Sequence, residues 1–213
     1  MLSADDHDRL ARTCGSAATA GIVLFALACG AVQFLRPDLD WLRAPLSFYL
    51  LGRCGAVVQS VYVALAAALV LLGTGYYRAL PRTARSAAPL LLFAVGAVAL
   101  CVTAFEHSNL PQGVPTLEGY VHGVAAQTAF LCTGTAMLLQ AWRLRADPRW
   151  RPRFAFAFGY AALCFAALWV QAGWHGAPRG LTQKLLIALI LGWLLLAARW
   201  LRRGPPAMAG SGA

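Results

Sequence analysis

Six long apolar segments, separated by short connections, constrain this chain more than any other feature. They cover residues 15–35, 54–77, 88–106, 119–142, 154–172 and 182–201. A helix needs roughly 20 mainly apolar residues to cross a hydrocarbon core of about 30 Å, and lipid offers no partner to an unpaired backbone group. The pattern therefore predicts an all-α fold, a polytopic membrane bundle of six transmembrane helices.

The composition agrees with a membrane protein. Hydrophobic residues make up 60% of the chain and charged residues 12%, whereas soluble domains carry about 25% charged residues. The connections are too short to fold alone, so we expect one transmembrane domain over residues 1–202 and a flexible C-terminal tail over residues 203–213. The expected location is the cell (inner) membrane, as a multi-pass protein.

Basic residues are distributed unevenly between the two sides of the predicted bundle. Thirteen of the 18 lysines and arginines lie before the first span, in the second and fourth connections, or at the end of the last span: Arg9, Arg12, Arg78, Arg82, Arg85, Arg143, Arg145, Arg149, Arg151, Arg153, Arg199, Arg202 and Arg203. Such an excess marks the cytoplasmic side and places both termini there. The positive net charge therefore reflects membrane orientation, and no nucleic-acid partner is expected.

Carboxylates and histidines gather at the other, extracytoplasmic side. The stretch AFEHSNLPQGVPTLEGYVHG, residues 104–123, holds two glutamates and two histidines. Glu118 and His122 are four residues apart, so a helix places them on one face. His122 lies one turn inside the fourth span, where a titratable group is unfavourable without partners. Glu118, His122 and Glu106 are therefore the candidate catalytic residues.

Further polar and aromatic residues lie near the same side and are expected to bind a substrate. They are Ser47, Tyr49, Arg53, Tyr120, Gln171, Trp174, His175 and Lys184. Gln171 and His175 repeat the four-residue spacing, and Arg53 and Lys184 begin spans where they could neutralise the carboxylates. Polar residues inside the spans, Ser60 and Thr128 among them, are expected to hydrogen-bond to neighbouring helices.

The second span raises a question about its start. A helix that begins at Pro45 and runs to Tyr77 would measure ~50 Å at about 1.5 Å per residue, too long for one perpendicular span. Either Gly52 and Gly55 break this helix, or its first turns lie at the membrane interface. Both alternatives place Ser47, Tyr49 and Arg53 near the polar residues described above.

The ligand types also allow a metal. Histidine and glutamate are ligands of zinc and iron, and His107, His122 and His175 would be the histidine ligands. No compact metal motif such as HExxH is present. The sequence therefore assigns no definite cofactor, and a divalent metal stays open.

Several short motifs together resemble one known family. They are Ser47 and Gly52 at the start of the second span, Phe105–Glu106 at the end of the third, His122 in the fourth, and GLTQKLLIALILGW at residues 180–193. Over residues 15–202 the chain resembles an uncharacterised prokaryotic six-span membrane protein family, domain of unknown function nine-nine-eight. The resemblance implies the six-span fold and adds Gln183 to the residues expected to bind a substrate. It implies no reaction.

Two motifs of this chain differ from the family pattern. The usual core of serine, acid, leucine and glycine reads Ser–Phe–Tyr–Leu–Leu–Gly over residues 47–52, so the acid is missing. The usual Phe–Pro–acid has lost its proline at Phe105–Glu106. If that acid is essential in the family, this member differs in activity.

Two classes of function follow from these residues. In the first, the protein is a membrane enzyme in which Glu118 or Glu106 and His122 perform acid/base chemistry, with or without a metal, on a lipid or isoprenoid that enters from the outer leaflet. Hydrolysis, isomerisation and cyclisation all stay open. In the second, it is a non-catalytic binding, sensor or accessory protein, and a transporter is the least favoured. The expected partners are membrane lipids and an amphiphilic small molecule; the sequence does not define the oligomeric state.

Overall fold

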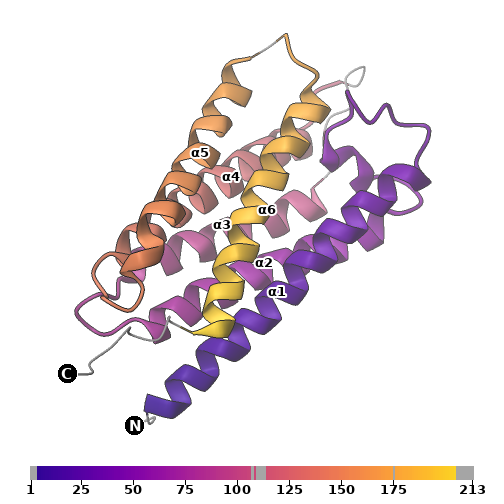
Figure 1. The fold of residues 1–213 in the computed structure, drawn as a ribbon. Coiled ribbons are helices and arrows are strands. Elements are labelled where there is room, and N and C mark those ends of the chain that lie inside the picture. The colour runs from indigo at the N-terminus through magenta and orange to yellow at the C-terminus, as the bar shows by residue number, and fades with distance from the viewer. Residues whose placement is uncertain (1–3, 107, 109–113, 175, 205–213) are drawn as a thin grey trace, which may run out of the picture.

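The computed structural model describes residues 4–106, 108, 114–174 and 176–204 (Figure 1). The six long helices are α1 (Ala4–Leu35), α2 (Gly55–Ala79), α3 (Ala87–Phe105), α4 (Leu117–Leu144), α5 (Phe154–Gly173) and α6 (Arg179–Arg203). Two short 3₁₀ helices, η1 (Leu46–Leu50) and η2 (Arg151–Arg153), precede α2 and α5. All six long helices are long and apolar enough to cross a membrane, and no strand occurs within the described ranges. The predicted all-α, six-span fold is confirmed.

The start of the second span follows the first of the two predicted alternatives. The 3₁₀ helix η1 ends at Leu50, and α2 begins only at Gly55. Gly52 lies between them with a φ of 84°, a left-handed conformation that glycine adopts readily and other residues rarely do. The chain is therefore broken at Gly52, and η1 lies outside the span. Residues 205–213, most of the predicted tail, lie outside the described residues.

The helices are arranged as a closed ring in which each packs against its neighbours in the sequence (Figure 1). α6 completes the ring by packing against both α5 and α1. An even number of antiparallel helices places the start of α1 and the end of α6 at one end, together with the α2–α3 and α4–α5 connections. We call this the arginine-rich end. The other end carries residues 36–54, which we call the cap, and is the capped end.

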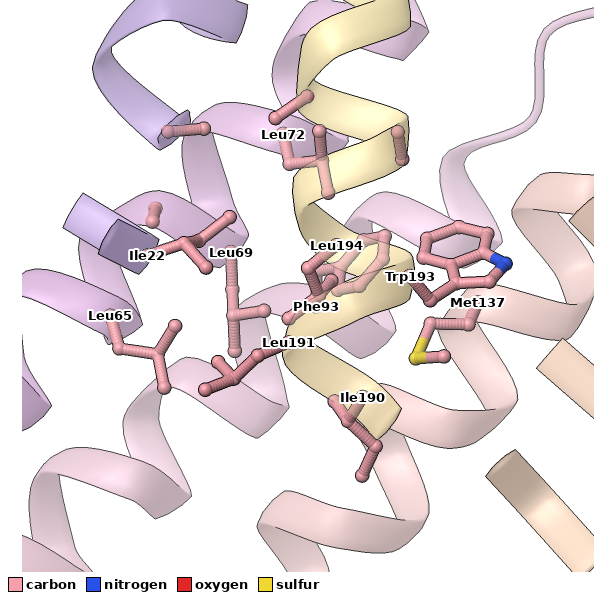
Figure 2. Packing of buried hydrophobic residues seen from close by; sticks show 14 of the residues in the cluster. Ile22, Leu65, Leu69, Leu72, Phe93, Met137, Ile190, Leu191, Trp193 and Leu194 are labelled. Carbon is pink, nitrogen blue, oxygen red and sulfur yellow. The ribbon is translucent and has the colours of Figure 1, made fainter. Parts of the chain in front are cut away.

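Apolar side chains of α6 meet those of α2 and α3 in the middle of the bundle (Figure 2). Leu191 and Leu194 of α6 lie beside Leu69 of α2 and Phe93 of α3 (Figure 2), and all four are buried. Lipid tails are as apolar as leucine, so water exclusion does little to hold transmembrane helices together. Close packing and hydrogen bonds between helices must do this instead.

Two aromatic side chains provide such hydrogen bonds. The Tyr76 hydroxyl of α2 donates to the Ala197 carbonyl of α6 at 2.9 Å, and the Trp193 indole of α6 donates to the Ala157 carbonyl of α5 at 2.8 Å. The hydroxyls of Ser60 and Thr128 behave differently, because each donates to the carbonyl four residues earlier in its own helix. The prediction that these two residues link neighbouring helices is therefore wrong.

The helix α5 is attached less firmly toward its C-terminal end. Its first half contacts α4 through Phe158, whose ring centre lies 5.6 Å from that of Trp142, and α6 through Ala157. Just past the middle of the helix, Phe165 still lies against Gly134 of α4. In its second half, Trp169 and Val170 are each 58% exposed. At the capped end, α5 therefore contributes little to the side of the bundle between α4 and α6.

The charge distribution gives a testable orientation for the bundle. In a variant whose six native cysteines, all free thiols, are replaced, Pro178→Cys should react with an impermeant maleimide added to intact cells. Pro148→Cys, at the arginine-rich end, should react only after lysis, since arginine-rich connections stay in the cytoplasm. Both positions are exposed, so they form a matched pair. The reverse labelling pattern would show that the arginine-rich end is extracytoplasmic.

Candidate functional site

A cavity of about 100 Å³ lies inside the bundle toward the capped end. Five of the six long helices and η1 contribute to its wall, and α5 does not. Its polar lining residues are Ser47, Tyr62, Thr103, His122, Thr133 and Gln183. The remaining lining residues are apolar or glycine, so the cavity is mainly apolar with a few polar groups, as ligand sites usually are.

The polar groups concentrate toward one end of this cavity. Thr103 lies in the last turn of α3, and His122 and Gln183 lie in the second turns of α4 and α6. Ser47 joins them from η1. Leu69, Leu191 and the other residues nearer mid-helix make the deeper part mainly apolar. The cavity is therefore amphipathic along the direction of the helices.

His122 is buried, with 6% of its surface exposed, and one ring nitrogen has a fixed partner. Its Nδ1 lies 2.9 Å from the backbone carbonyl oxygen of Glu106. A carbonyl can only accept, so Nδ1 carries the proton, and in the neutral ring Nε2 is left as an acceptor. Because His122 lines the cavity, Nε2 is the ring nitrogen available to a ligand.

The position of Glu106 explains why its carbonyl is available. Glu106 is the C-cap of α3, and the last carbonyls of a helix have no partner within the helix. His122 in α4 satisfies one of them. The end of α3 thus fixes the orientation of the imidazole through backbone alone, and the Glu106 carboxylate is not needed for this contact.

The neighbouring polar groups provide complementary hydrogen-bonding capacity. Thr103 donates its hydroxyl to the Ala99 carbonyl at 2.9 Å, which leaves its oxygen as an acceptor. The Gln183 carbonyl oxygen accepts from the Leu46 backbone N–H at 2.9 Å, so its NH₂ donors stay available. A polar group of a ligand at this end could both donate and accept.

The cap is attached to the first turns of α6 by hydrogen bonds. The Leu181 backbone N–H donates to the Leu42 carbonyl at 2.8 Å, and the Lys184 ammonium donates to the Trp41 carbonyl. The bond between Gln183 and the Leu46 N–H is the third of these contacts. The Lys184 side chain, predicted to bind a substrate, therefore binds the cap.

A close backbone approach accompanies these hydrogen bonds. A Cβ placed on Gly180 would lie 2.5 Å from the Ala44 carbonyl oxygen, far inside van der Waals contact. Only glycine allows the cap to lie this close to α6. The segment GLTQK at residues 180–184 thus serves mainly to hold the cap over the cavity.

Arg36 stabilises the cap from the other side. Its guanidinium donates to both carboxylate oxygens of Asp38, at 2.8 and 2.7 Å, and also to the Leu51 carbonyl. The hydrogen bond from Arg36 lowers the pKa of Asp38 below its usual value. Gly52 lies directly against the guanidinium, since a Cβ there would be 2.9 Å from Nη1. Arg36 therefore connects the two ends of the cap.

Tyr49 lies within the cap rather than in the cavity wall. Its side chain is buried, and its hydroxyl has no hydrogen bond to any residue that the structure describes. Burial raises the pKa of this phenol. The Lys184 Nζ lies 5.4 Å from the centre of its ring, a cation–π distance.

The structure does not bring the predicted carboxylates into the cavity. Glu118 is exposed in the first turn of α4, and Arg53 is exposed just before α2. The Glu106 side chain is half-buried and lines an outer groove between α2 and α3. Of the three candidate catalytic residues, only His122 lines the cavity.

Of the other residues predicted to bind a substrate, some line the cavity and others do not. Ser47 and Gln183 line the cavity beside His122. Tyr120 and Trp174 are 69% and 61% exposed, and Gln171 is half-buried near the end of α5. None of these three lines the cavity.

The predicted metal ligands are the three histidines His107, His122 and His175. His107 and His175 lie outside the described residues, and His122 is the one predicted histidine ligand whose position is known. Within the described ranges, no three potential ligands come together. A divalent metal stays a prediction.

Sequence reasoning missed three lining residues, namely Tyr62, Thr103 and Thr133. Each is a polar residue inside an apolar span, which is a signal for a functional position. Thr103 also lies one turn before Glu106, the residue that orients His122. Their shared cavity depends on how α2, α3 and α4 pack, which spacing along one helix does not reveal.

Comparison with known protein families gave a match over most of the chain. The family model described as "Protein of unknown function (DUF998)" matches residues 19–200. The chain belongs to the DUF998 family. Comparison with curated proteins and with solved structures gave no match. In this DUF998 protein, two of the motifs, residues 47–52 and 180–184, lie in the cap and in the part of α6 that binds it.

The close contact between the cap and α6 predicts that a methyl group added at Gly180 destabilises the protein. Gly180→Ala should displace Ala44 and lower the free energy of unfolding by ~1–3 kcal/mol, as overpacking does. Thermal unfolding in detergent would measure this. Gly159→Ala is the matched control, because Gly159 is an exposed helical glycine with no atom near its missing Cβ, and alanine favours a helix by up to ~1 kcal/mol. Equal melting temperatures for the two variants would contradict the close contact.

Proposed function

We propose that this DUF998 protein takes the apolar part of a lipid or isoprenoid into the cavity and that His122 exchanges a proton with the polar group of that molecule. The observation that carries the proposal is the imidazole itself. It is buried at the polar end of a mainly apolar cavity, and its bond to Glu106 assigns the proton to Nδ1. Nε2 is thereby prepared to accept a proton.

The size of the cavity limits what it can hold. About 100 Å³ is well below the roughly 300–1,000 Å³ of sites that enclose whole drug-sized ligands. The cavity therefore fits one segment of an amphiphile, and the rest of the molecule must extend outward.

The side between α4 and α6 offers a route for that extension. Ala126 and Phe130 of α4 and Ile187 of α6 line the cavity but are only half-buried. The last turns of α5, with Trp169 and Val170 exposed, leave this side thinly covered near the capped end. A lipid could thus enter laterally from the bilayer, with its polar group at the capped end and its chain between α4 and α6.

The residues that line the cavity favour a reaction that begins when a base accepts a proton from the substrate. Nε2 of His122 would accept a proton from a hydroxyl, a water or an activated C–H of the substrate, and the imidazolium would keep its Nδ1–H bond to Glu106. The ring would then return the proton to the product. General acid–base catalysis of this kind contributes about 10²–10⁴-fold to a rate.

The lining residues bear on the three reaction types that the sequence left open, namely hydrolysis, isomerisation and cyclisation. Cyclisation of an isoprenoid begins by protonating an alkene, for which a carboxylic acid is the usual donor. The carboxylates of Glu106 and Glu118 do not line the cavity, which favours hydrolysis or isomerisation. A non-catalytic binding protein is the second candidate, because Tyr62 is the one other ionisable side chain in the lining.

Two substitutions at His122 separate a structural from a chemical role. In His122→Asn, the amide NH₂ takes the place of Nδ1–H and keeps the bond to Glu106, while Nε2 is lost. In His122→Gln, the amide extends toward the position of Nε2 and the bond to Glu106 is lost. We expect His122→Asn to keep the wild-type melting temperature and to change the bound amphiphile, as identified by mass spectrometry of protein purified with its native lipids.

The nature of that change tells the two candidate functions apart. An enzyme should retain an unconverted substrate in His122→Asn, whereas a receptor should lose its ligand. Ala126→Leu, which fills the cavity, should also reduce the amount bound, and Ala188→Leu on the exposed face of α6 should not. The same ligand in the same amount in all four variants would contradict the proposal.

A further inference from the structure

A second pocket, of about 180 Å³, lies at the arginine-rich end, far from His122 along the helices. The start of α1, the end of α2, the α4–α5 connection and the end of α6 all contribute to it. Its charged lining residues are Asp8, Arg12, Arg149 and Arg203. Segments that are distant in the sequence thus bring three guanidinium groups to one hollow.

A buried acid fixes one of these arginines. Asp147 is 2% exposed, and its carboxylate accepts from the Arg149 guanidinium at 3.0 Å and from the Arg149 backbone N–H at 3.0 Å. The Asp147 carbonyl also accepts from the backbone N–H groups of Trp150 and Arg151. The turn formed by residues 147–151 therefore holds Arg149 in place at the edge of the pocket.

A fourth arginine lies beside the pocket without a carboxylate partner in the described part of the chain. The Arg153 guanidinium lies 5.0 Å from the ring centre of Trp150 and 5.2 Å from that of Trp200. One of its nitrogens donates to the Gly204 carbonyl at 3.3 Å. Two aromatic rings thus hold this cation next to Arg203, at the end of α6.

The charges at this place do not balance. Four guanidinium groups, from Arg12, Arg149, Arg153 and Arg203, face two carboxylates, from Asp8 and Asp147. Among the residues that the structure describes, neither Arg12 nor Arg203 has an ion-pair partner. The buried indole N–H of Trp150, which also lines the pocket, has no acceptor there either. The pocket therefore offers several donors to an anion that carries several acceptor oxygens.

We propose that this pocket binds the phosphate group of an anionic phospholipid. Guanidinium groups match the geometry of phosphate oxygens with pairs of parallel N–H donors. Basic pockets between the ends of transmembrane helices lie at the level of the lipid headgroups and bind acidic ones. A volume of about 180 Å³ suits a headgroup phosphate while the acyl chains stay in the bilayer. This site is independent of the function proposed for His122.

Native mass spectrometry of the full chain, titrated with phosphatidylglycerol, tests the proposal. The double variant Arg12→Gln, Arg203→Gln should bind this lipid roughly 10- to 30-fold more weakly, since it loses two of the guanidinium groups that line the pocket. The matched control is Arg9→Gln, Arg202→Gln, which removes the same charge from the same two helices. All four arginines are exposed, but Arg9 and Arg202 do not line this pocket, so the control should stay within about twofold of wild type.

Three outcomes would overturn the proposal. Equal losses in the two double variants would mean that diffuse positive charge attracts the lipid. Equal binding of phosphatidylglycerol and phosphatidylcholine would show that the pocket does not require a net negative charge on the lipid. If inorganic phosphate displaced the lipid at matched concentration, the ligand would be a soluble phosphate. Circular dichroism of each variant would show that the helices are retained.

Discussion

The hydrogen bond between His122 and the Glu106 carbonyl is the interaction on which the candidate site depends. The hydrocarbon of a bilayer offers an imidazole no hydrogen-bond partner, and an unpaired polar group there is unfavourable by several kcal/mol. The end of α3 provides a carbonyl that needs a donor, and His122 provides the donor. One contact thus satisfies two groups, joins α3 to α4, and leaves the second ring nitrogen of a cavity-lining side chain as an acceptor.

The cap completes this arrangement from the opposite wall. Its attachment to α6 uses backbone groups, a glycine and the side chains of Gln183 and Lys184. The cap in turn brings Ser47 to the cavity. Residues 47–52 and 180–184 therefore help to close the polar end of a mainly apolar cavity.

The sequence predicted the six helices well, because apolar stretches of this length have few alternatives in a membrane. It also singled out His122 as a titratable residue inside a span, and the structure places this residue in the lining of the cavity. The spacing of Glu118 gives its helix face but not its depth, and the structure places it in the exposed first turn of α4. Asp147 was missed for a related reason: among many arginines it has the pattern of an ordinary loop charge, and its burial depends on how the connection folds.

The most direct test of the account is the protonation of the two ring nitrogens of His122 in a bilayer. Solid-state NMR of protein with nitrogen-15 histidine would resolve them, and the spectrum of His122→Asn would identify which signals belong to this residue. We expect a protonated Nδ1, hydrogen-bonded to the Glu106 carbonyl, and an unprotonated Nε2 whose signal shifts when the bound amphiphile is removed. A proton on Nε2, with Nδ1 bare, would contradict it.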